Sequence, residues 1–448
     1  MKKFQLLPLT FALGLGLASM ANAQSLTELY DFARAYDAPY QSAKAQYDAN
    51  LYKADQAKAS LMPTVNLSAG VTNTQLQIDA AAHDSLPASN TTKSYDTQTS
   101  GLNATQPLYR PSNYATYQQG VRTADLAQAQ LEAAEQDLIV RVSQTYFDLL
   151  GAQDTLTFVQ AQKVAVAEQL ASAKRNFEVG TATITDTRDA QARYDLVIAQ
   201  EIAADNDLRV KRLALDILVG KTNISPKPLA SPVSLPALVP TDMSVWVQQG
   251  QDMHPTIKQS RIALEIAQLE IDKSYAGHKP TLDLNAGYNI NRNVNGTAIN
   301  SYDSRTTAAT IGLAFNLPLF AGMATQNRLR ETLSLEEKAR ADLETTQRTV
   351  MQGTRAAYFG VVSGLGQVKA LEAAEASSQS ALDANKLGYQ VGVKVNIDVL
   401  NSQSQLYQTK RDLAKARYDV LVGGLKLKQA SGLLTANDLQ GVNALLVK

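Results

Sequence analysis

The sequence predicts a mostly α-helical protein with a transmembrane β part, in which a helix-strand-strand-long helix-turn-helix unit occurs twice. Three observations support this fold class. A short turn recurs at a large fixed spacing, proline is missing from residues 112–225 and 319–448, and three segments alternate apolar and polar side chains. A fixed spacing indicates duplication, proline-free stretches admit long helices, and a period of two indicates strands with one apolar face.

The duplication is centred on two turns, residues 179–183 and 391–395. Each turn begins with Val-Gly and has an aspartate six residues after its glycine, Asp186 in one case and Asp398 in the other. Further pairs recur at the same offset: 146–147 with 358–359, and 190–191 with 402–403. The two turns should therefore occupy equivalent places in two similar halves of the chain.

Residues 1–23 are predicted to be a signal peptide, because two lysines precede an apolar run and an Ala-x-Ala-like cleavage site. The apolar run is shorter than the ~20 residues of a membrane-spanning helix, so cleavage is favoured over anchoring. Without those two lysines the chain has 40 basic and 42 acidic residues, which argues against nucleic acid as a partner. The absence of cysteine excludes disulfides, a thiolate metal site, a cysteine nucleophile and a lipid-modified N-terminal cysteine.

The proline-free stretches predict two helical hairpins that pack as coiled coils. A single helix from Tyr114 to Phe177 would be on the order of 95 Å long at ~1.5 Å per residue. After the second turn an apolar residue recurs every seven positions, and small residues mostly follow three positions later. The apolar positions are Val399, Leu406, Leu413, Val420 and Leu427. A seven-residue repeat keeps one seam toward a partner helix, and small residues let the two backbones approach closely.

Four segments are predicted to be strands, at about 63–78, 95–107, 280–294 and 304–318. Three of them alternate clearly. The segment 95–107 alternates poorly and is assigned by its place in the repeat, which matches that of 304–318. Polar loops at 79–94 and 295–303 join the strands of each pair, and five prolines in 226–240 predict an extended linker between the halves.

The predicted strands have the length and alternation of outer-membrane β-barrel strands. A soluble sheet packed on helices is the alternative, although such a sheet would expose two long edges. Four strands cannot close a membrane barrel, since such barrels begin at about eight strands. Two chains would give eight strands and a filled interior, whereas three would give twelve strands and an open lumen. A conducting protein would therefore be a trimer.

The chain resembles the TolC family of outer-membrane channels over essentially the whole mature sequence. The resemblance rests on the duplicated plan, on Pro39 and Pro255 near the start of each half, and on several short runs. These runs are 108–109, 319–320, 388–392, 397–400 and 414–418. The resemblance implies a homotrimer with a twelve-stranded barrel in the outer membrane and a coiled-coil tunnel in the periplasm. It also implies three partners: outer-membrane lipid, a periplasmic adaptor (membrane fusion protein) and an inner-membrane translocase.

The same resemblance places the two turns at the periplasmic tip, where the tunnel narrows. The turn residues expected to contact the adaptor are Val179, Gly180, Thr181, Val391, Gly392 and Val393. Tyr389 and Lys394 match positions that tie the inner helix pair to the neighbouring pair, through residues matching Thr185 and Asp186. Asp398 matches an acidic ring that lines the constriction.

Two residues at the expected gate depart from the family pattern. Lys394 stands where the family has arginine, and an ammonium cannot form the two-pronged bond that a guanidinium makes with a carboxylate. Asn401 stands where the family has a second acidic residue. The resemblance therefore implies a weaker clasp and about half the negative charge at the constriction.

A purely structural interpretation of these residues is also available. Gly180 and Gly392 suit positive-φ positions after a helix, and Thr183 with Asp186 fits a capping box. Asp398 would lie in a first helical turn, where the helix dipole favours a carboxylate. Lys394 has no capping role and is the residue most in need of a functional explanation.

The sequence does not predict an enzyme. His83, His254 and His278 are scattered, lack metal-ligand spacing and fit no Ser-His-Asp arrangement, so neither a metal nor a cofactor is expected. Two non-enzymatic alternatives stay open. One is a periplasmic adaptor protein, and the other is a structural coiled-coil surface protein that does not conduct.

The predicted function is that of an outer-membrane exit duct in a Gram-negative cell. The duct would serve a tripartite efflux pump, a type I secretion system or both, and would pass small molecules or unfolded protein to the exterior. The predicted domains are a signal peptide (1–23), a first repeat (24–225), a linker (226–240), a second repeat (241–440) and a C-terminal tail (441–448).

Overall fold

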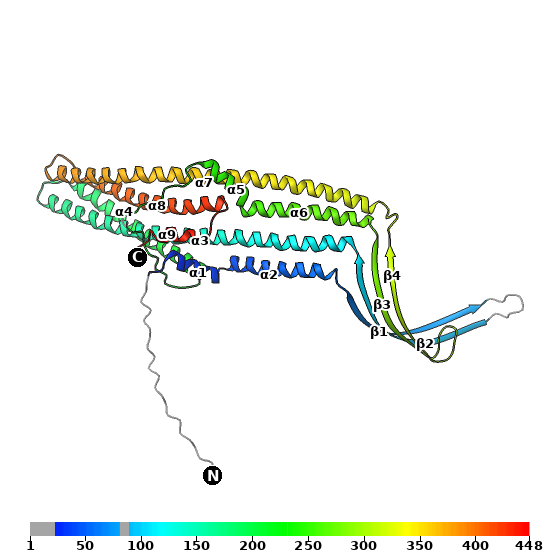
Figure 1. Ribbon diagram of the computed structural model, residues 1–448. Helices are drawn as coiled ribbons and strands as arrows, with labels where there is room; N and C mark the ends of the chain where they lie inside the picture. Colours follow the sequence, from blue (N-terminus) through cyan, green and yellow to red (C-terminus); the bar gives the residue numbers. More distant parts are fainter. Residues whose placement is uncertain (1–22, 81–88, 231, 448) are drawn as a thin grey trace, which may run out of the picture.

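The protein is elongated, with a curved β-sheet at one end and two helical hairpins at the other (Figure 1). The computed structural model describes residues 23–80, 89–230 and 232–447. The predicted signal peptide lies outside this part except for its last residue, and so does the centre of the loop predicted at 79–94.

The two repeats follow the same order of elements. The first contains α1 (Leu26–Tyr36), α2 (Ala38–Ala59), β1 (Thr64–Ala80), β2 (Ser89–Tyr109), α3 (Pro111–Glu178) and α4 (Ile184–Val219). The second contains α5 (Met243–Met253), α6 (Pro255–Tyr275), the 3-10 helix η1 (Ala276–His278), β3 (Thr281–Val294), β4 (Ser304–Asn316), α7 (Ala324–Gln390) and α8 (Asn396–Ala430). The short helix α9 (Asp438–Asn443) follows the second repeat.

The helix expected at the start of each half is divided into two helices. Asp37 and His254 cap the N-termini of α2 and α6 through their side chains. Pro39 and Pro255 lie in the first turn after these caps. Proline fits a first turn but cannot donate the hydrogen bond that would continue the preceding helix, so each helix pair breaks there.

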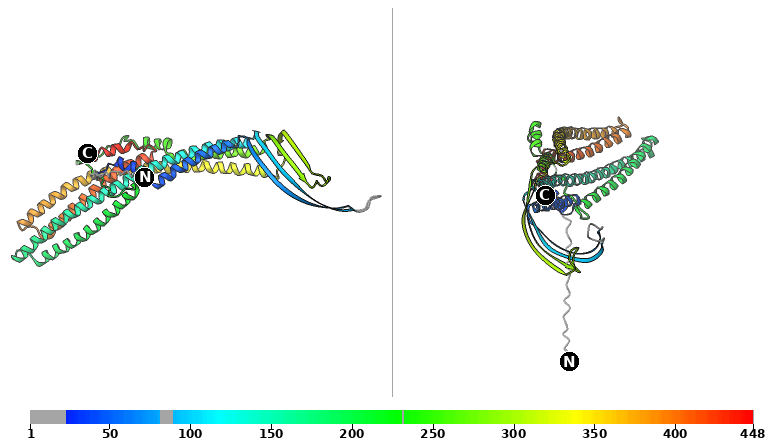
Figure 2. Two further views of the ribbon diagram at one scale, coloured as in Figure 1. Left: turned by 90° about the horizontal axis from the view of Figure 1, so that it is seen from below. Right: turned by 90° about the vertical axis from the view of Figure 1, so that its right-hand side faces the viewer.

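The four strands form one antiparallel sheet in the order β1-β2-β3-β4, so the pairing of β2 with β3 joins the repeats. Its register sorts the side chains onto two faces. The apolar face carries a row formed by Leu67, Leu102, Tyr288 and Ala309, and the opposite, polar face carries rows of small and amide side chains. Viewed along the long axis the sheet forms an arc (Figure 2).

Strand β2 is longer than the sequence predicts, since it begins at Ser89 and not near residue 95. Residues 89–94 show no alternation of apolar and polar side chains, so a pattern search finds no strand there. They pair with β1 up to the Ser89–Ala80 pair. Backbone hydrogen bonding to the partner strand extends this strand without a buried apolar face.

The helices form a single curved layer with open edges. Near the sheet, α3 packs between α2 and α6, and α7 packs on α6. Toward the turns, α3 packs between α4 and α8, and α7 packs on α8. Helices α3 and α7 therefore run through both halves, and one face of α7 has no partner within the described residues.

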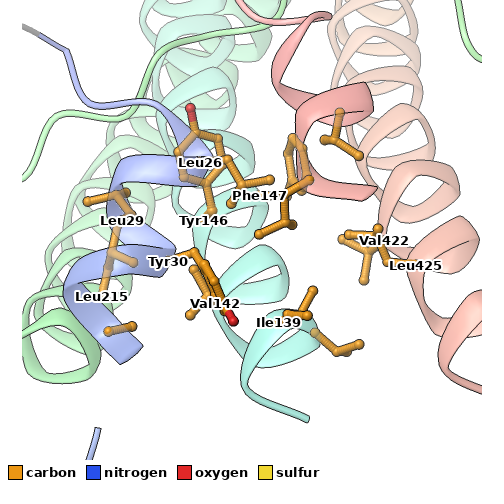
Figure 3. Packing of buried hydrophobic residues seen from close by; sticks show 14 of the residues in the cluster. Leu26, Leu29, Tyr30, Ile139, Val142, Tyr146, Phe147, Leu215, Val422 and Leu425 are labelled. Atoms are coloured by element: carbon orange, nitrogen blue, oxygen red, sulfur yellow. The ribbon is translucent and has the colours of Figure 1, made fainter. Parts of the chain in front are cut away.

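The main hydrophobic cluster lies where the two halves of this layer meet (Figure 3). It gathers side chains from α1, α2, α3, α4, α8 and α9. Phe147 of α3 stacks on Tyr418 of α8, with ring centroids 5.5 Å apart, and the Tyr418 hydroxyl donates to Asp154 at 2.6 Å. Burial raises the pKa of the Asp154 carboxyl and that of the Tyr418 hydroxyl.

A buried ion pair fixes the break between α1 and α2 against α3. The Arg141 guanidinium donates to both carboxylate oxygens of Asp37, at 2.9 and 2.8 Å. Asp37 is 5% exposed. Hydrogen bonds from Arg141 lower the pKa of the Asp37 carboxyl despite its burial. Removal of one partner of such a pair is strongly destabilising, because it leaves the other charge buried without compensation.

In the segment predicted to be a C-terminal tail, residues 441–448, the described residues 441–447 are folded against the rest of the protein. Helix α9 crosses the predicted boundary at 440, and Leu446 is buried in the main cluster. The Ala230 N–H donates to the Leu445 carbonyl, and the Val447 N–H donates to the Pro228 carbonyl, both at 2.9 Å. Apolar residues at the chain end and backbone pairing with the linker explain the difference.

Candidate gate at the helical end

The two turns at the tips of the hairpins have the same backbone geometry. Gly180 and Gly392 have φ values of +78° and +79°, and a Cβ at either position would meet no atom within 4 Å. Glycine is therefore favoured by the left-handed backbone and not by crowding. The Gly180 N–H donates to the Phe177 carbonyl at 3.0 Å, and the Gly392 N–H donates to the Tyr389 carbonyl at 3.1 Å.

The helices that follow the turns begin differently. Thr183 caps α4, and the Asp186 carboxylate accepts the Thr183 N–H at 3.0 Å, which confirms the predicted capping box. Helix α8 begins after Val395, whose side chain cannot cap it. Asp398 lies in the first turn of α8, as predicted, and its carboxylate is 3.6 Å from the Lys394 ammonium.

A buried asparagine ties the second hairpin to the first. Asn396, the first residue of α8, is 1% exposed. Its amide group donates to the carbonyl oxygen of Asp186 at 3.2 Å, and its side-chain oxygen accepts a hydrogen bond from the amide of Gln169 on α3. One side chain of α8 thus contacts both helices of the first hairpin.

Two further side-chain pairs connect the hairpins near the tip. Asn176 at the end of α3 donates to the Tyr389 hydroxyl at 3.1 Å. Arg193 of α4 donates to the side-chain oxygen of Asn401 at 2.8 Å. The Asn401 pair is exposed, so solvent competes for it more than for the buried Asn396 contacts.

The structure brings together some of the predicted gate residues and separates others. Tyr389, Asp186 and Asn401 lie in contacts between the two hairpins. Lys394 pairs with Asp398 inside its own hairpin, and Thr185 is exposed on α4. The assigned roles, tying the inner helix pair to the neighbouring pair and lining the constriction, stay predictions for all of these residues, Lys394 and Thr185 included.

Sequence reasoning missed the partner residues Asn396, Gln169, Asn176 and Arg193. One signal for Asn396 was present. At the repeat offset it corresponds to Ile184, so an amide occupies a position that is apolar in the other half. A polar residue that becomes buried at such a position needs hydrogen-bond partners.

The turn residues expected to contact an adaptor are strongly exposed. Val179, Val391 and Val393 are 71%, 66% and 76% exposed. Exposed apolar side chains at a molecular tip are compatible with a protein contact surface, and contact with an adaptor stays a prediction.

The comparisons with known proteins agree with this architecture. The model of the family described as outer membrane efflux protein matches residues 29–221 and 246–433. The chain belongs to this family. Relatives of the chain include the outer membrane protein TolC of Vibrio cholerae, which is 33% identical over 99% of this chain and 98% of its own length. TolC of Escherichia coli is 30% identical, over 100% of this chain and 90% of that protein.

Other family members are named for secretion. The alkaline protease secretion protein AprF of Pseudomonas aeruginosa is 29% identical over 95% of this chain and 88% of its own length. Among solved structures, VceC of Vibrio cholerae matches with a TM-score of 0.75 at 20% identity, covering 91% of this chain and 96% of its own. The CmeC channel of Campylobacter jejuni matches with a TM-score of 0.76 at 17% identity, covering 99% of this chain and 98% of its own. These structures share the fold.

The hairpins are joined near the tip by side-chain hydrogen bonds, whereas the Lys394–Asp398 ion pair lies within the second hairpin. Within residues 23–80, 89–230 and 232–447, no group of three or more His, Cys, Asp or Glu side chains could hold a metal ion. Over the same ranges, no helix carries an apolar stretch long enough to cross a bilayer. The family is described by efflux, TolC by its place in the outer membrane and AprF by protease secretion, and none of these names is that of an enzyme.

Proposed function

We propose that the protein is the outer-membrane exit duct of a tripartite efflux pump, a type I secretion system or both. Outer-membrane localisation with a periplasmic extension follows from membership of the family. The observation that carries the proposal is a sheet with two free edges and an exposed apolar face, which lies at the end of the long helices opposite the two turns. Leu67, Ile311 and Leu313 on that face are 80%, 79% and 66% exposed, as expected for side chains that face lipid.

The free edges of the sheet support a homotrimer. In the described chain β1 pairs only with β2, and β4 pairs only with β3. Unpaired strand edges cannot lie in a membrane, because their backbone groups would lack hydrogen bonds. Three subunits joined edge to edge would give twelve strands and leave an open lumen.

The internal repeat indicates how the helices of neighbouring subunits would meet. Phe147 of α3 is 1% exposed because it packs on Tyr418 of α8. Phe359 holds the equivalent position on α7 and is 59% exposed. The residue of α4 equivalent to Tyr418 is Asn206. Because the repeats are alike, α7 should pack on α4 of the next subunit, with Phe359 against Asn206.

The tip contacts support a gate at the periplasmic end. The contacts of Asn396 and Tyr389 hold the second hairpin against the first, and Asp398 would line the constriction with Asn401 beyond it. A periplasmic adaptor that docks on the exposed turn valines would weaken these contacts and favour opening. A translocase of the inner membrane would act on the same contacts through the adaptor. Replacing Lys394 with alanine should raise single-channel conductance, because it frees the Asp398 carboxylate from its only ion pair in the described residues.

The relatives support two kinds of cargo. Some are named for efflux and others for protease secretion, so small molecules and unfolded protein are both proposed to pass. A lumen lined by the polar face of the sheet presents amide and hydroxyl groups, which impose little choice on what passes. Selection of cargo is therefore assigned to the translocase.

Membrane fractionation followed by conductance measurement in planar bilayers tests the function. The full-length protein should sediment with the outer membrane, form a trimer and conduct ions. A soluble adaptor or a non-conducting surface protein would fail the conductance test. Recovery of a stable water-soluble monomer would contradict the proposal.

A further inference from the structure

Two arginines lie directly opposite each other on the apolar face of the sheet. The register of β3 and β4 pairs Arg292 with Arg305, and the same row continues to Gln98 of β2. Both arginines are exposed. Like charges directly opposite each other destabilise a strand pair, because the Cβ atoms are only ~4.5–5.5 Å apart. An anion between the two guanidinium groups would remove this repulsion.

The chain itself supplies no such anion in the ranges 23–80, 89–230 and 232–447. Within them, neither arginine takes part in a hydrogen bond or an ion pair. Asp96, one row further along β2, accepts a hydrogen bond from the Asn73 amide at 2.7 Å. Asp303, just before β4, accepts the Asn295 N–H at 2.9 Å. Neither of these carboxylates forms an ion pair with Arg292 or Arg305 in the described residues.

A hollow of about 660 Å³ lies beside the arginine pair. The two guanidinium groups line this hollow together with Gln98 and Ser100, whose side chains can also form hydrogen bonds. Ala69, Val71 and Ile290 supply apolar walls. Cationic groups next to an apolar surface suit an amphiphile that has an anionic head and hydrocarbon chains.

The position of the pair along the strand corresponds to the level of lipid headgroups. Arg305 lies ten residues from Phe315, which is at the end of β4 nearest the helices. Ten residues span about 33 Å at ~3.3 Å per residue. A tilt of ~40° reduces this to about 25 Å, the height of the apolar band of an outer-membrane barrel. The arginines thus mark the end of the band farthest from the periplasmic helices.

We propose that Arg292 and Arg305 bind a phosphate group of an outer-leaflet glycolipid of the lipid A class. A guanidinium group matches two phosphate oxygens at once, and two guanidinium groups can hold one phosphate between them. The acyl chains would then lie along the apolar face below the pair. This inference rests on the proposed function, since it requires the sheet to span the outer membrane with its apolar face toward lipid.

Binding of bisphosphorylated lipid A to the purified full-length trimer in uncharged detergent tests the proposal. Arg292→Gln and Arg305→Gln should each weaken binding about tenfold, and the double variant about a hundredfold, because charge-assisted hydrogen bonds are lost. The double variant with Arg292→Lys and Arg305→Lys should bind lipid A with an affinity between those of the wild type and the double glutamine variant. It keeps both positive charges but loses the two-pronged hydrogen bonding of the guanidinium groups. Arg261→Gln, an exposed arginine of α6 outside the sheet, is the matched control and should bind as the wild type does.

Three ligand controls separate the phosphorylated lipid from other anions. Dephosphorylated lipid A, inorganic phosphate and phosphatidylglycerol should each bind at least tenfold more weakly than lipid A. Equal binding of any one of them, or undiminished binding of lipid A by the double glutamine variant, would overturn the assignment. Conductance and trimer formation measured on the same preparations keep the two proposals apart. A conducting trimer without lipid A binding refutes only this inference.

Discussion

Asn396 is the residue whose replacement best tests the proposed gate. Its side chain contacts Gln169 on α3 and the Asp186 carbonyl on α4 while 1% exposed. Asn396→Ala removes these contacts and leaves their partners without one hydrogen bond each, at about 1–2 kcal/mol per subunit after relaxation. If three subunits open together, the closed state loses about 3–6 kcal/mol. The ratio of open to closed channels should then rise roughly a hundredfold or more.

Single-channel recording in planar bilayers measures this change directly. Asn396→Ala should conduct more, or open more often, than the wild type. Asn385→Ala is the matched control, because Asn385 donates to the Ser402 hydroxyl at 2.5 Å within the second hairpin and does not connect the hairpins. A folded Asn396→Ala trimer with wild-type conductance would refute the assignment of this contact to the gate.

Three further predictions follow from packing and charge. Because the chain has no cysteine, a double variant with Phe359→Cys and Asn206→Cys can be treated with a short bismaleimide cross-linker. It should give covalent trimers, which neither single variant should give. A conducting trimer that cannot be cross-linked would contradict the helix pairing. Arg141→Ala should lower the free energy of unfolding by about 3–5 kcal/mol in denaturant titrations, because it strands a buried carboxylate. The pKa of the Asp37 carboxyl is lower in the folded protein than its ordinary value of 3.8. The ion pair therefore contributes stability that is fully present above pH 3.8 and is lost as pH falls through the folded pKa. The wild type should lose stability more steeply below pH 3.8 than Arg141→Ala does. Burial lowers the pKa of the His254 imidazole below its ordinary value of 6.5, so the stability of the wild type should fall as pH drops below 6.5. His254→Asn keeps a cap on α6 without titrating, and its melting temperature should depend less on pH.

Local chemistry in this chain was readable from the sequence, and contacts between distant segments were not. The capping box at Thr183 and Asp186 depends on four consecutive residues and was predicted correctly. The positive φ of Gly180 and Gly392 likewise follows from the helix ends on either side. These features need no knowledge of what lies across the fold.

The contacts that were missed join residues far apart in sequence. Gln169 and Asn396 are 227 residues apart, and Arg193 and Asn401 are 208 apart. No periodicity encodes such pairs, because one polar residue at a packed position resembles a surface residue until its partner is known. The early start of β2 was missed for a related reason, since residues 89–94 are held by pairing with β1 and not by a pattern of their own.

The two ends of the described chain meet at the main cluster. The Leu26 N–H donates to the Asn443 side chain across 417 residues, and Leu26 packs in the same cluster as Leu446. The cluster around α1 therefore stays incomplete until Leu439, Val442 and Leu446 have joined it. The first repeat cannot complete its core without residues that follow the second, so we expect the two copies to fold as one cooperative unit and not one after the other.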